Sequence, residues 1–206
     1  MKKFKSFTGG PYATNCFFVK APGGNILFDA PEGADAAFAR ERVDLLVLTH
    51  GHWDHVADAA AIKTRHHCPV LCHAETVPMV SEKDFFVRQG FPLQVPPVVP
   101  DGELAEGPGQ SLSGWKVDVF DVPGHCPGSL CFFSPEDKLL IGGDVLFRGG
   151  IGRWDLPGGD GEILLRGIHT KLMTLPRDTM VLSGHGPATT IGEEKSANPF
   201  LLAGSG

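Results

Sequence analysis

The chain has little tyrosine, no clustered positive charge and no long apolar stretch. Its 206 residues include one tyrosine, and no run of lysine and arginine is longer than Lys2-Lys3. The net charge is −6, and without a basic patch the sequence has no electrostatic footprint for nucleic acid or anionic lipid. No stretch approaches the roughly 18 uninterrupted apolar residues of a membrane-spanning helix. We therefore expect neither a nucleic-acid partner nor a membrane partner.

Cysteine is scarce as well, and the chain opens without an apolar signal core. The first residues are basic and run directly into a Gly-Gly-Pro turn. An odd number of cysteines in a chain of this size is not typical of a secreted disulfide framework. We therefore expect reduced thiols and a cytoplasmic protein. The 5 cysteines are Cys16, Cys68, Cys72, Cys126 and Cys131.

Glycine, proline and histidine are abundant by contrast. The 27 glycines and 17 prolines make up about a fifth of the chain, above the average of roughly 12% but below the range of low-complexity sequences. The chain must therefore turn often while still folding, and its length fits a single domain over residues 1–206. The 9 histidines matter because imidazole is the commonest protein ligand for metals.

Apolar patterning predicts a mixed α and β structure. Residues 15–20 and 25–29 form a predicted hairpin around a Pro-Gly-Gly turn. Residues 44–49 are almost continuously aliphatic, which is typical of a strand buried on both faces. Residues 91–108 are rich in proline and glycine and predict an irregular connection. Helices are predicted over 56–65, 76–88 (interrupted by Pro78) and 161–175, and further strands over 69–73, 115–122, 130–133, 138–142 and 179–183.

Polar residues gather where these predicted strands end. The hexapeptide HGHWDH at 50–55 directly follows the buried strand and precedes a predicted helix. Three later residues also lie near strand ends with glycine beside them. Loops at strand ends are where a rigid scaffold holds chemical groups, and glycine lets the backbone pass close to a crowded centre. The seven candidate ligands are His50, His52, Asp54, His55, His125, Asp144 and His185.

The chemistry of this set points to a hydrolytic metal centre. Five imidazoles and two carboxylates, with no thiolate, exceed the four ligands of one closed structural zinc site. Such nitrogen and oxygen donors suit two metal ions with open positions. A carboxylate can bridge two ions about 3.5–4 Å apart, and a water shared between them loses its proton near neutral pH.

The same residues carry a resemblance to a known family. The HGHWDH motif, followed by His125, Asp144 and His185, resembles the metallo-β-lactamase superfamily over nearly the whole chain. This resemblance implies an α+β fold, a four-layer αββα sandwich. Residues 152–160 and 184–194, and the terminal Asn-Pro-Phe-Leu at 198–201, are similar to short, single-domain glyoxalase II-like (hydroxyacylglutathione hydrolase-like) proteins.

The resemblance also implies roles for individual residues. One metal ion is expected on His50, His52 and His125, a second on Asp54, His55 and His185, with Asp144 bridging them. Zinc is usual in the family, and iron or manganese is also accommodated. The implied activity is hydrolysis of a small-molecule thioester of the hydroxyacylglutathione type by a hydroxide held between the ions. Asp54 and Asp144 are the expected catalytic residues, in a monomer or homodimer.

Full glyoxalase II enzymes carry a C-terminal helical domain that binds glutathione, yet only 21 residues follow His185, so we do not expect that domain here.

Two alternatives to thioester hydrolysis remain open at this stage. Persulfide dioxygenases share similar histidine motifs and a Gly-Arg-x-Asp loop, and they would place a single iron on His50, His125 and Asp144. A lactonase or another hydrolase of the metallo-β-lactamase fold is the third possibility.

Several neighbouring residues are candidates for support or substrate contact. Asp29 is a candidate either to accept a hydrogen bond from a ligand imidazole or to cap a turn. Thr49 and Ser183 are candidates to hydrogen-bond a ligand, because metal-binding histidines generally need such a partner. Arg153 either meets an anionic substrate or forms an ion pair with Asp155. The residues that either line the pocket or pack in the core are Cys126, Phe147 and Trp154.

Overall fold

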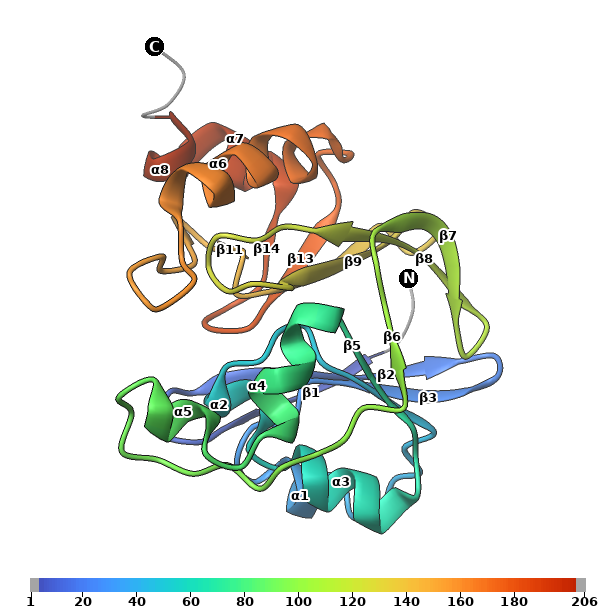
Figure 1. The fold of residues 1–206 in the computed structure, drawn as a ribbon. Coiled ribbons are helices and arrows are strands. Elements are labelled where there is room, and N and C mark those ends of the chain that lie inside the picture. The colour runs from blue at the N-terminus through green and yellow to red at the C-terminus, as the bar shows by residue number, and fades with distance from the viewer. Residues whose placement is uncertain (1–3, 203–206) are drawn as a thin grey trace.

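The structure, a computed structural model, describes residues 4–202 and contains two six-stranded β-sheets packed face to face. Helices cover the outer face of each sheet, so that the layers run helix, sheet, sheet, helix (Figure 1). The predicted α+β class and four-layer αββα sandwich are therefore confirmed. The single domain expected over residues 1–206 extends beyond the described residues at both ends and stays a prediction.

The first sheet comes from the N-terminal half of the chain, and its strands lie in sequence order. The first three strands pair antiparallel, and each later strand pairs in parallel with the one before it. The predicted hairpin and the buried strand after it are both present. The strands are β1 (Phe4–Gly9), β2 (Thr14–Ala21), β3 (Gly24–Phe28), β4 (Leu45–Val47), β5 (Val70–Cys72) and β6 (Gly102–Glu103).

The second sheet has the order β14-β13-β10-β9-β8-β7 and is antiparallel except for the β10–β13 pair. A small separate hairpin, β11 and β12, follows β10. The strands are β7 (Gly107–Leu112), β8 (Trp115–Asp121), β9 (Leu130–Ser134), β10 (Leu139–Gly143), β11 (Leu146–Phe147), β12 (Gly150–Ile151), β13 (Met180–Ser183) and β14 (Thr189–Thr190).

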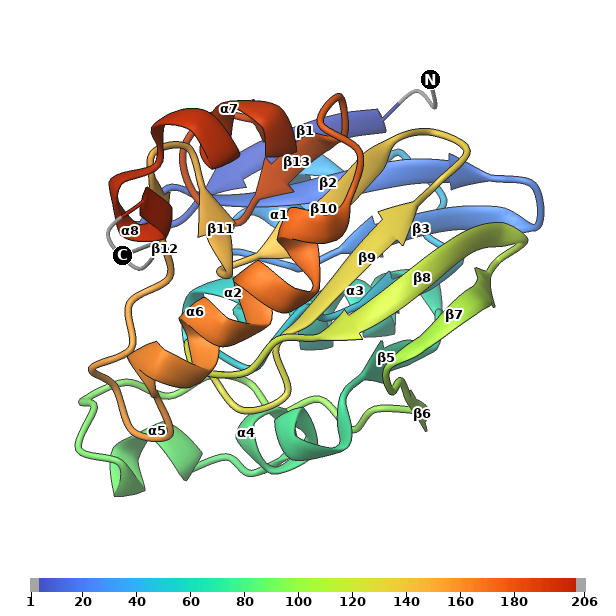
Figure 2. The same ribbon diagram turned by 90° about the horizontal axis from the view of Figure 1, so that it is seen from above.

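Short helices fill the two outer layers, and α6 and α7 lie over the second sheet (Figure 2). None of the helices within residues 4–202 is long and apolar enough to cross a membrane. The α-helices are α1 (Ala34–Ala37), α2 (Trp53–Val56), α3 (Ala59–His66), α4 (Val77–Ser81), α5 (Phe85–Arg88), α6 (Gly161–Thr170), α7 (Ile191–Ala197) and α8 (Pro199–Leu202), and the 3-10 helices are η1 (Ala74–Thr76) and η2 (Leu172–Thr174).

Alternation of side chains along the strands divides the core into three layers. In β2, Phe17 and Val19 pack between the two sheets, whereas Cys16 and Phe18 pack against the first helical layer. This is the two-residue period of a strand that is buried on both faces. Across the central core, the Phe28 ring lies 5.1 Å from the ring of Phe132 in the second sheet. Both sheets therefore form a stiff base for the loops that leave their ends.

Proline 78 acts differently from our expectation. The sequence predicts a helix over 76–88 that Pro78 interrupts, but Pro78 lies in the first turn of α4. Proline is tolerated there, because the first-turn N–H groups have no partner within the helix. The interruption instead falls between Ser81 and Phe85, where α4 ends and α5 begins.

Candidate metal centre

All seven predicted ligands meet at one edge of the sandwich. His50 to His55 follow β4 and open α2, His125 precedes β9, Asp144 follows β10 and His185 follows β13. Backbone hydrogen bonds join these loops: Leu130 donates to the carbonyl of Thr49 at 2.8 Å, and Gly184 donates to that of Gly143 at 2.8 Å. Loops from both sheets therefore place the candidate ligands next to one another.

The ligand atoms form two groups with Asp144 between them. Atoms of His50, His52 and His125 lie within 4.8 Å of one another, and so do atoms of Asp54, His55 and His185. A third group, His50, His55 and Asp144, connects the two. The side chains of each expected ligand set therefore lie together, with Asp144 beside both sets, and their metal-binding roles stay a prediction.

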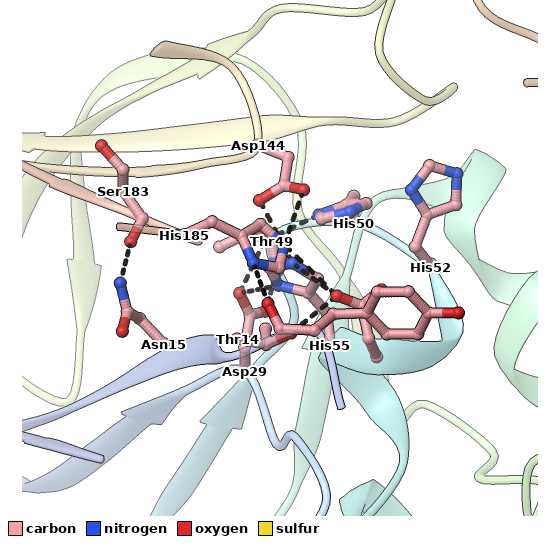
Figure 3. Close-up of polar contacts among 12 residues, drawn as sticks. Thr14, Asn15, Asp29, Thr49, His50, His52, His55, Asp144, Ser183 and His185 are labelled. Atoms are coloured by element: carbon pink, nitrogen blue, oxygen red, sulfur yellow. Dashed lines mark hydrogen bonds and ion pairs between the residues drawn. The ribbon is translucent and has the colours of Figure 1, made fainter. Parts of the chain in front are cut away.

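Asp144 faces both sets directly. Its Oδ1 lies 3.2 Å from His55 Nε2, and its Oδ2 lies 3.2 Å from His185 Nε2 and 3.5 Å from His125 Nε2. In Figure 3 the imidazoles of His50, His55 and His185 gather beside its carboxylate. One carboxylate is therefore within reach of imidazoles from each group.

Several buried polar atoms at this point fit a metal ion. His50 Nε2, His55 Nε2 and Asp144 Oδ1 are buried and have no hydrogen-bond partner. Leaving such groups unpaired costs about 1–3 kcal/mol each, so buried polar atoms normally have partners. Three such atoms within 4.8 Å of one another are suited to coordinating a cation.

Asp29 orients two of the imidazoles, that of His55 directly and that of His50 through Thr49. Its Oδ2 accepts hydrogen bonds from His55 Nδ1 and from Thr49 Oγ1, both at 2.8 Å. Because the Thr49 hydroxyl donates to Asp29, its oxygen accepts from His50 Nδ1 at 3.0 Å. These contacts place a proton on Nδ1 of both imidazoles and turn both Nε2 atoms toward the centre. The predicted supporting roles of Asp29 and Thr49 agree with these contacts.

Replacing Asp29 by asparagine should weaken metal binding by roughly 10–100-fold, the usual cost of losing such a partner. An asparagine fits the shape and tolerates the left-handed backbone here (φ 62°). Its NH2 group, however, would face either the Thr49 N–H now bonded to Oδ1 or the two donors now bonded to Oδ2, and it can accept from neither. Competition with a chromogenic chelator measures the affinity. Asp178→Asn, which removes an exposed carboxylate paired with Lys138, serves as the control and should bind metal like the wild type. Unchanged affinity in Asp29→Asn would contradict the role given to Asp29.

The other two imidazoles of the first group also point inward. His125 Nδ1 donates to the carbonyl of Arg153 at 2.8 Å, so the lone pair of His125 lies on Nε2. That Nε2 lies 2.8 Å from His52 Nδ1. Two imidazole nitrogens so close to each other are suited to binding a common ion. Sequence reasoning did not find the Arg153 carbonyl, because a backbone oxygen has no residue-type signature.

Residues near the N-terminus hydrogen-bond the side chains of the second group and the loop that carries His185. Thr14 Oγ1 donates to Asp54 Oδ2 at 2.7 Å, and His185 Nδ1 donates to the carbonyl of Tyr12 at 3.0 Å. Asn15 fixes the His185 loop, with its N–H bonded to the Gly184 carbonyl at 2.7 Å. None of these three was predicted, because the β1–β2 hairpin is far from the ligands in the sequence.

The charges in this centre are divided between the two groups. Burial lowers the pKa of His50 well below its ordinary value and that of His52 to about 3, so both imidazoles are neutral. Burial also opposes a charge on His55 and His185, but hydrogen bonds and attraction from Asp144 outweigh it. The pKa of His185 is raised to about 10 and that of His55 well above the ordinary value. The carboxylates thus create a field that favours cations at the second group.

A cavity of about 440 Å³ opens over the ligands. Tyr12, Trp53, Phe147 and Ile151 contribute apolar walls, and His52, Asp54, His125, Asp144 and His185 face it from below. Arg153 lines the rim but forms an exposed bidentate ion pair with Asp155, at 2.7 and 2.8 Å. The centre is therefore accessible to a small molecule.

Three of the remaining candidates pack instead of lining this cavity. Ser183 Oγ donates to the Leu146 carbonyl at 2.7 Å and so holds β11 in place, where we expected a bond to a ligand. Cys126 is fully buried, with its sulfur 3.7 Å from that of Met79. Trp154 is 42% exposed and packs edge-on against Phe200.

Comparison with known proteins gives a consistent result. The family model described as the metallo-beta-lactamase superfamily matches residues 9–185. Hydroxyacylglutathione hydrolase GloC of Haemophilus influenzae is 41% identical over 78% of this chain and 79% of its own. A crystal structure of the BLEG-1 B3 metallo-beta-lactamase has a TM-score of 0.89 at 34% identity, covering 97% of this chain and 99% of that one. A di-iron-bound crystal structure of TTHA1623 has a TM-score of 0.86 at 35% identity, covering 96% and 100%.

Proposed function

This chain belongs to the metallo-beta-lactamase superfamily, and from that premise we propose that it is a binuclear metal-dependent hydrolase that cleaves thioesters. One observation carries the proposal: the Asp144 carboxylate lies beside imidazoles of both ligand groups, and a buried imidazole nitrogen of each group, His50 Nε2 and His55 Nε2, has no hydrogen-bond partner. A mononuclear centre would need only one of these groups.

The residues fit two divalent ions. His50, His52 and His125 would hold one, Asp54, His55 and His185 the other, and Asp144 would contact both. Nitrogen and oxygen donors without thiolate suit zinc, iron or manganese. We expect zinc first, and the di-iron form of TTHA1623 supports iron as the alternative. When bound, the ions would supply a deprotonated water at neutral pH and polarise the substrate carbonyl.

The protein's own groups hold the reacting atoms in place. No serine or cysteine faces the ligand cavity within the described residues, so water is the expected nucleophile. Asp144 and Asp54 both reach the cavity, and Thr14 fixes one Asp54 oxygen. The carboxylate of Asp54 can orient a water toward the carbonyl carbon, and the surrounding aromatic side chains exclude bulk water from one side.

Thioesters are favoured over other acyl substrates because of one relative. GloC is a hydroxyacylglutathione hydrolase, and its 41% identity spans most of both chains. S-Lactoylglutathione is therefore the first substrate to assay. The likeness to BLEG-1 makes β-lactam hydrolysis the second candidate, with nitrocefin as the matching substrate.

Protein purified without added metal should contain two equivalents of zinc, iron or manganese, and dialysis against a chelator should abolish thioester cleavage. Elemental analysis gives the content, and loss of thioester absorbance gives the rate. Adding back the metal found in the purified protein should restore the rate of thioester cleavage. One equivalent of iron, with oxygen uptake on glutathione persulfide and no thioester cleavage, would instead identify a persulfide dioxygenase.

A further inference from the structure

A second cavity, of about 240 Å³, lies beside the ligand cavity and plays no part in the arrangement described so far. The two cavities share His52, Trp53 and Leu156 as walls. A substrate whose carbonyl lies at the ligands can therefore extend past Trp53 into the second cavity. We call this space the apolar pocket.

The apolar pocket is built mainly by aromatic and aliphatic side chains from several separate segments of the chain. Phe86 of α5 and Phe91 after it contact Trp53, with ring centroids 5.7 and 4.8 Å away. Met79 of α4 adds a buried thioether, and the loop at 156–158 covers the opposite side. Figure 1 shows α5 and this loop on the same side of the molecule.

The charge of the apolar pocket restricts its occupant. Among the described residues that line it there is no lysine or arginine, and the single charged side chain is Glu75. Glu75 sits at the rim with its side chain 60% exposed. An anionic group would be desolvated here with no cation to pair with, which is costly, and it would also meet a like charge.

The size of the apolar pocket narrows the occupant further. At about 240 Å³ it falls below the roughly 300–1,000 Å³ of sites for drug-sized ligands. It therefore has room for one short aliphatic chain or a single aromatic ring.

Building on the proposed thioester cleavage, we propose that the apolar pocket binds an uncharged, apolar substituent of the thioester. Thioesters that carry such a substituent are then better substrates than S-lactoylglutathione, whose peptide is charged and whose acyl group is small. Burial of each methylene group is worth about fourfold in affinity, so a chain of several carbons has a measurable effect.

The experiment compares neutral thioesters of N-acetylcysteamine that differ only in the acyl group. The hexanoyl thioester should exceed the acetyl thioester in kcat/KM by about tenfold or more. A second series keeps acetyl and changes the thiol from N-acetylcysteamine to butanethiol, and the series that shows the gain identifies which side of the thioester enters the apolar pocket. No gain in either series overturns the inference. No hydrolysis of any thioester, acetyl included, overturns the proposed function instead.

Variants locate the effect. Phe91→Ala should remove most of the gain from a longer chain, measured as the ratio of hexanoyl to acetyl kcat/KM within the variant (or of butanethiol to N-acetylcysteamine acetyl thioester, if the thiol side enters). Val87→Ala is the matched control, because Val87 lies on the same segment, is 45% exposed and does not line the apolar pocket. If Phe91→Ala does not fold, Leu156→Ala tests the opposite wall of the apolar pocket, which the ligand cavity shares. An unchanged gain in a folded variant overturns the assignment.

A charged analogue tests the selectivity. The adipoyl thioester matches the hexanoyl one in length but ends in a carboxylate, so it should react at least tenfold more slowly if the acyl side enters the apolar pocket. If the thiol side enters, 4-mercaptobutanoate replaces butanethiol in the same comparison. Glu75→Gln should narrow this difference, measured as the ratio of the charged to the neutral rate within the variant. Equal rates for the charged and neutral members in the wild type contradict the proposed apolar selectivity.

Discussion

Replacing Asp144 by asparagine is expected to reduce thioester hydrolysis by on the order of 100-fold or more and to lower the bound metal below two equivalents. Loss of an outer partner of a metal ligand costs roughly 10–100-fold, and Asp144 is the one carboxylate in contact with imidazoles from both groups. An asparagine keeps the shape but removes the negative charge that offsets the ions.

The measurement combines steady-state rates with elemental analysis of the same samples. Asp178→Asn again serves as the control and should retain both ions and full activity. The thermal unfolding of the variant should also be measured to show that it is folded, because Asp144 is buried and its charge faces His55 and His185. If a folded Asp144→Asn protein kept two ions and the wild-type rate, the binuclear mechanism would be wrong.

Replacing Gly184 by alanine is expected to reduce thioester hydrolysis by a similar factor through a steric clash, without removing any ligand. A Cβ atom here would lie 2.1 Å from Asp144 Oδ1 and 2.6 Å from His55 Cε1, both far inside van der Waals contact. The Asp144 carboxylate and the His55 imidazole must therefore move together, and displacements of about 1 Å in such a site cost on the order of 100-fold in rate.

Gly142→Ala is the matched control for that variant. Gly142 lies in the buried strand β10, where a Cβ would meet its nearest neighbour, Val181 Cγ1, at an ordinary 3.7 Å. Circular dichroism melts, metal content and kcat/KM should separate the two alanines. Equal metal content and rate in both variants would show that the centre accommodates the extra atom.

The ligands could be found from the sequence because their residue types and positions are both unusual. Each follows or precedes a strongly apolar strand, has glycine nearby, and is an imidazole or a carboxylate. The strands themselves were recognisable because burial on both faces demands continuous aliphatic runs, as in residues 44–49. Asp29 and Thr49 were found by the same logic of strand ends.

Other parts of the site carry no such pattern. Tyr12 and Arg153 act through backbone carbonyls, which every residue has. Thr14 reaches Asp54 only because β2 pairs into the first sheet, a contact 40 positions apart in the chain. The apolar pocket depends on how irregular segments around α5 and residues 156–158 fold back. Periodicity says nothing about such segments, because their shape is set by tertiary packing.

The mixed origin of each ligand group has a consequence for folding. In both groups, two ligands follow β4 of the first sheet and one ligand belongs to the second sheet, His125 in one and His185 in the other. Ions bound there would hold the two sheets together and would bind the unfolded chain far less well. Each tenfold rise in free metal above the dissociation constant then adds about 1.4 kcal/mol per bound ion to the free energy of unfolding. The supply of metal would thereby regulate the lifetime of the folded protein in the cell, in addition to its catalytic rate.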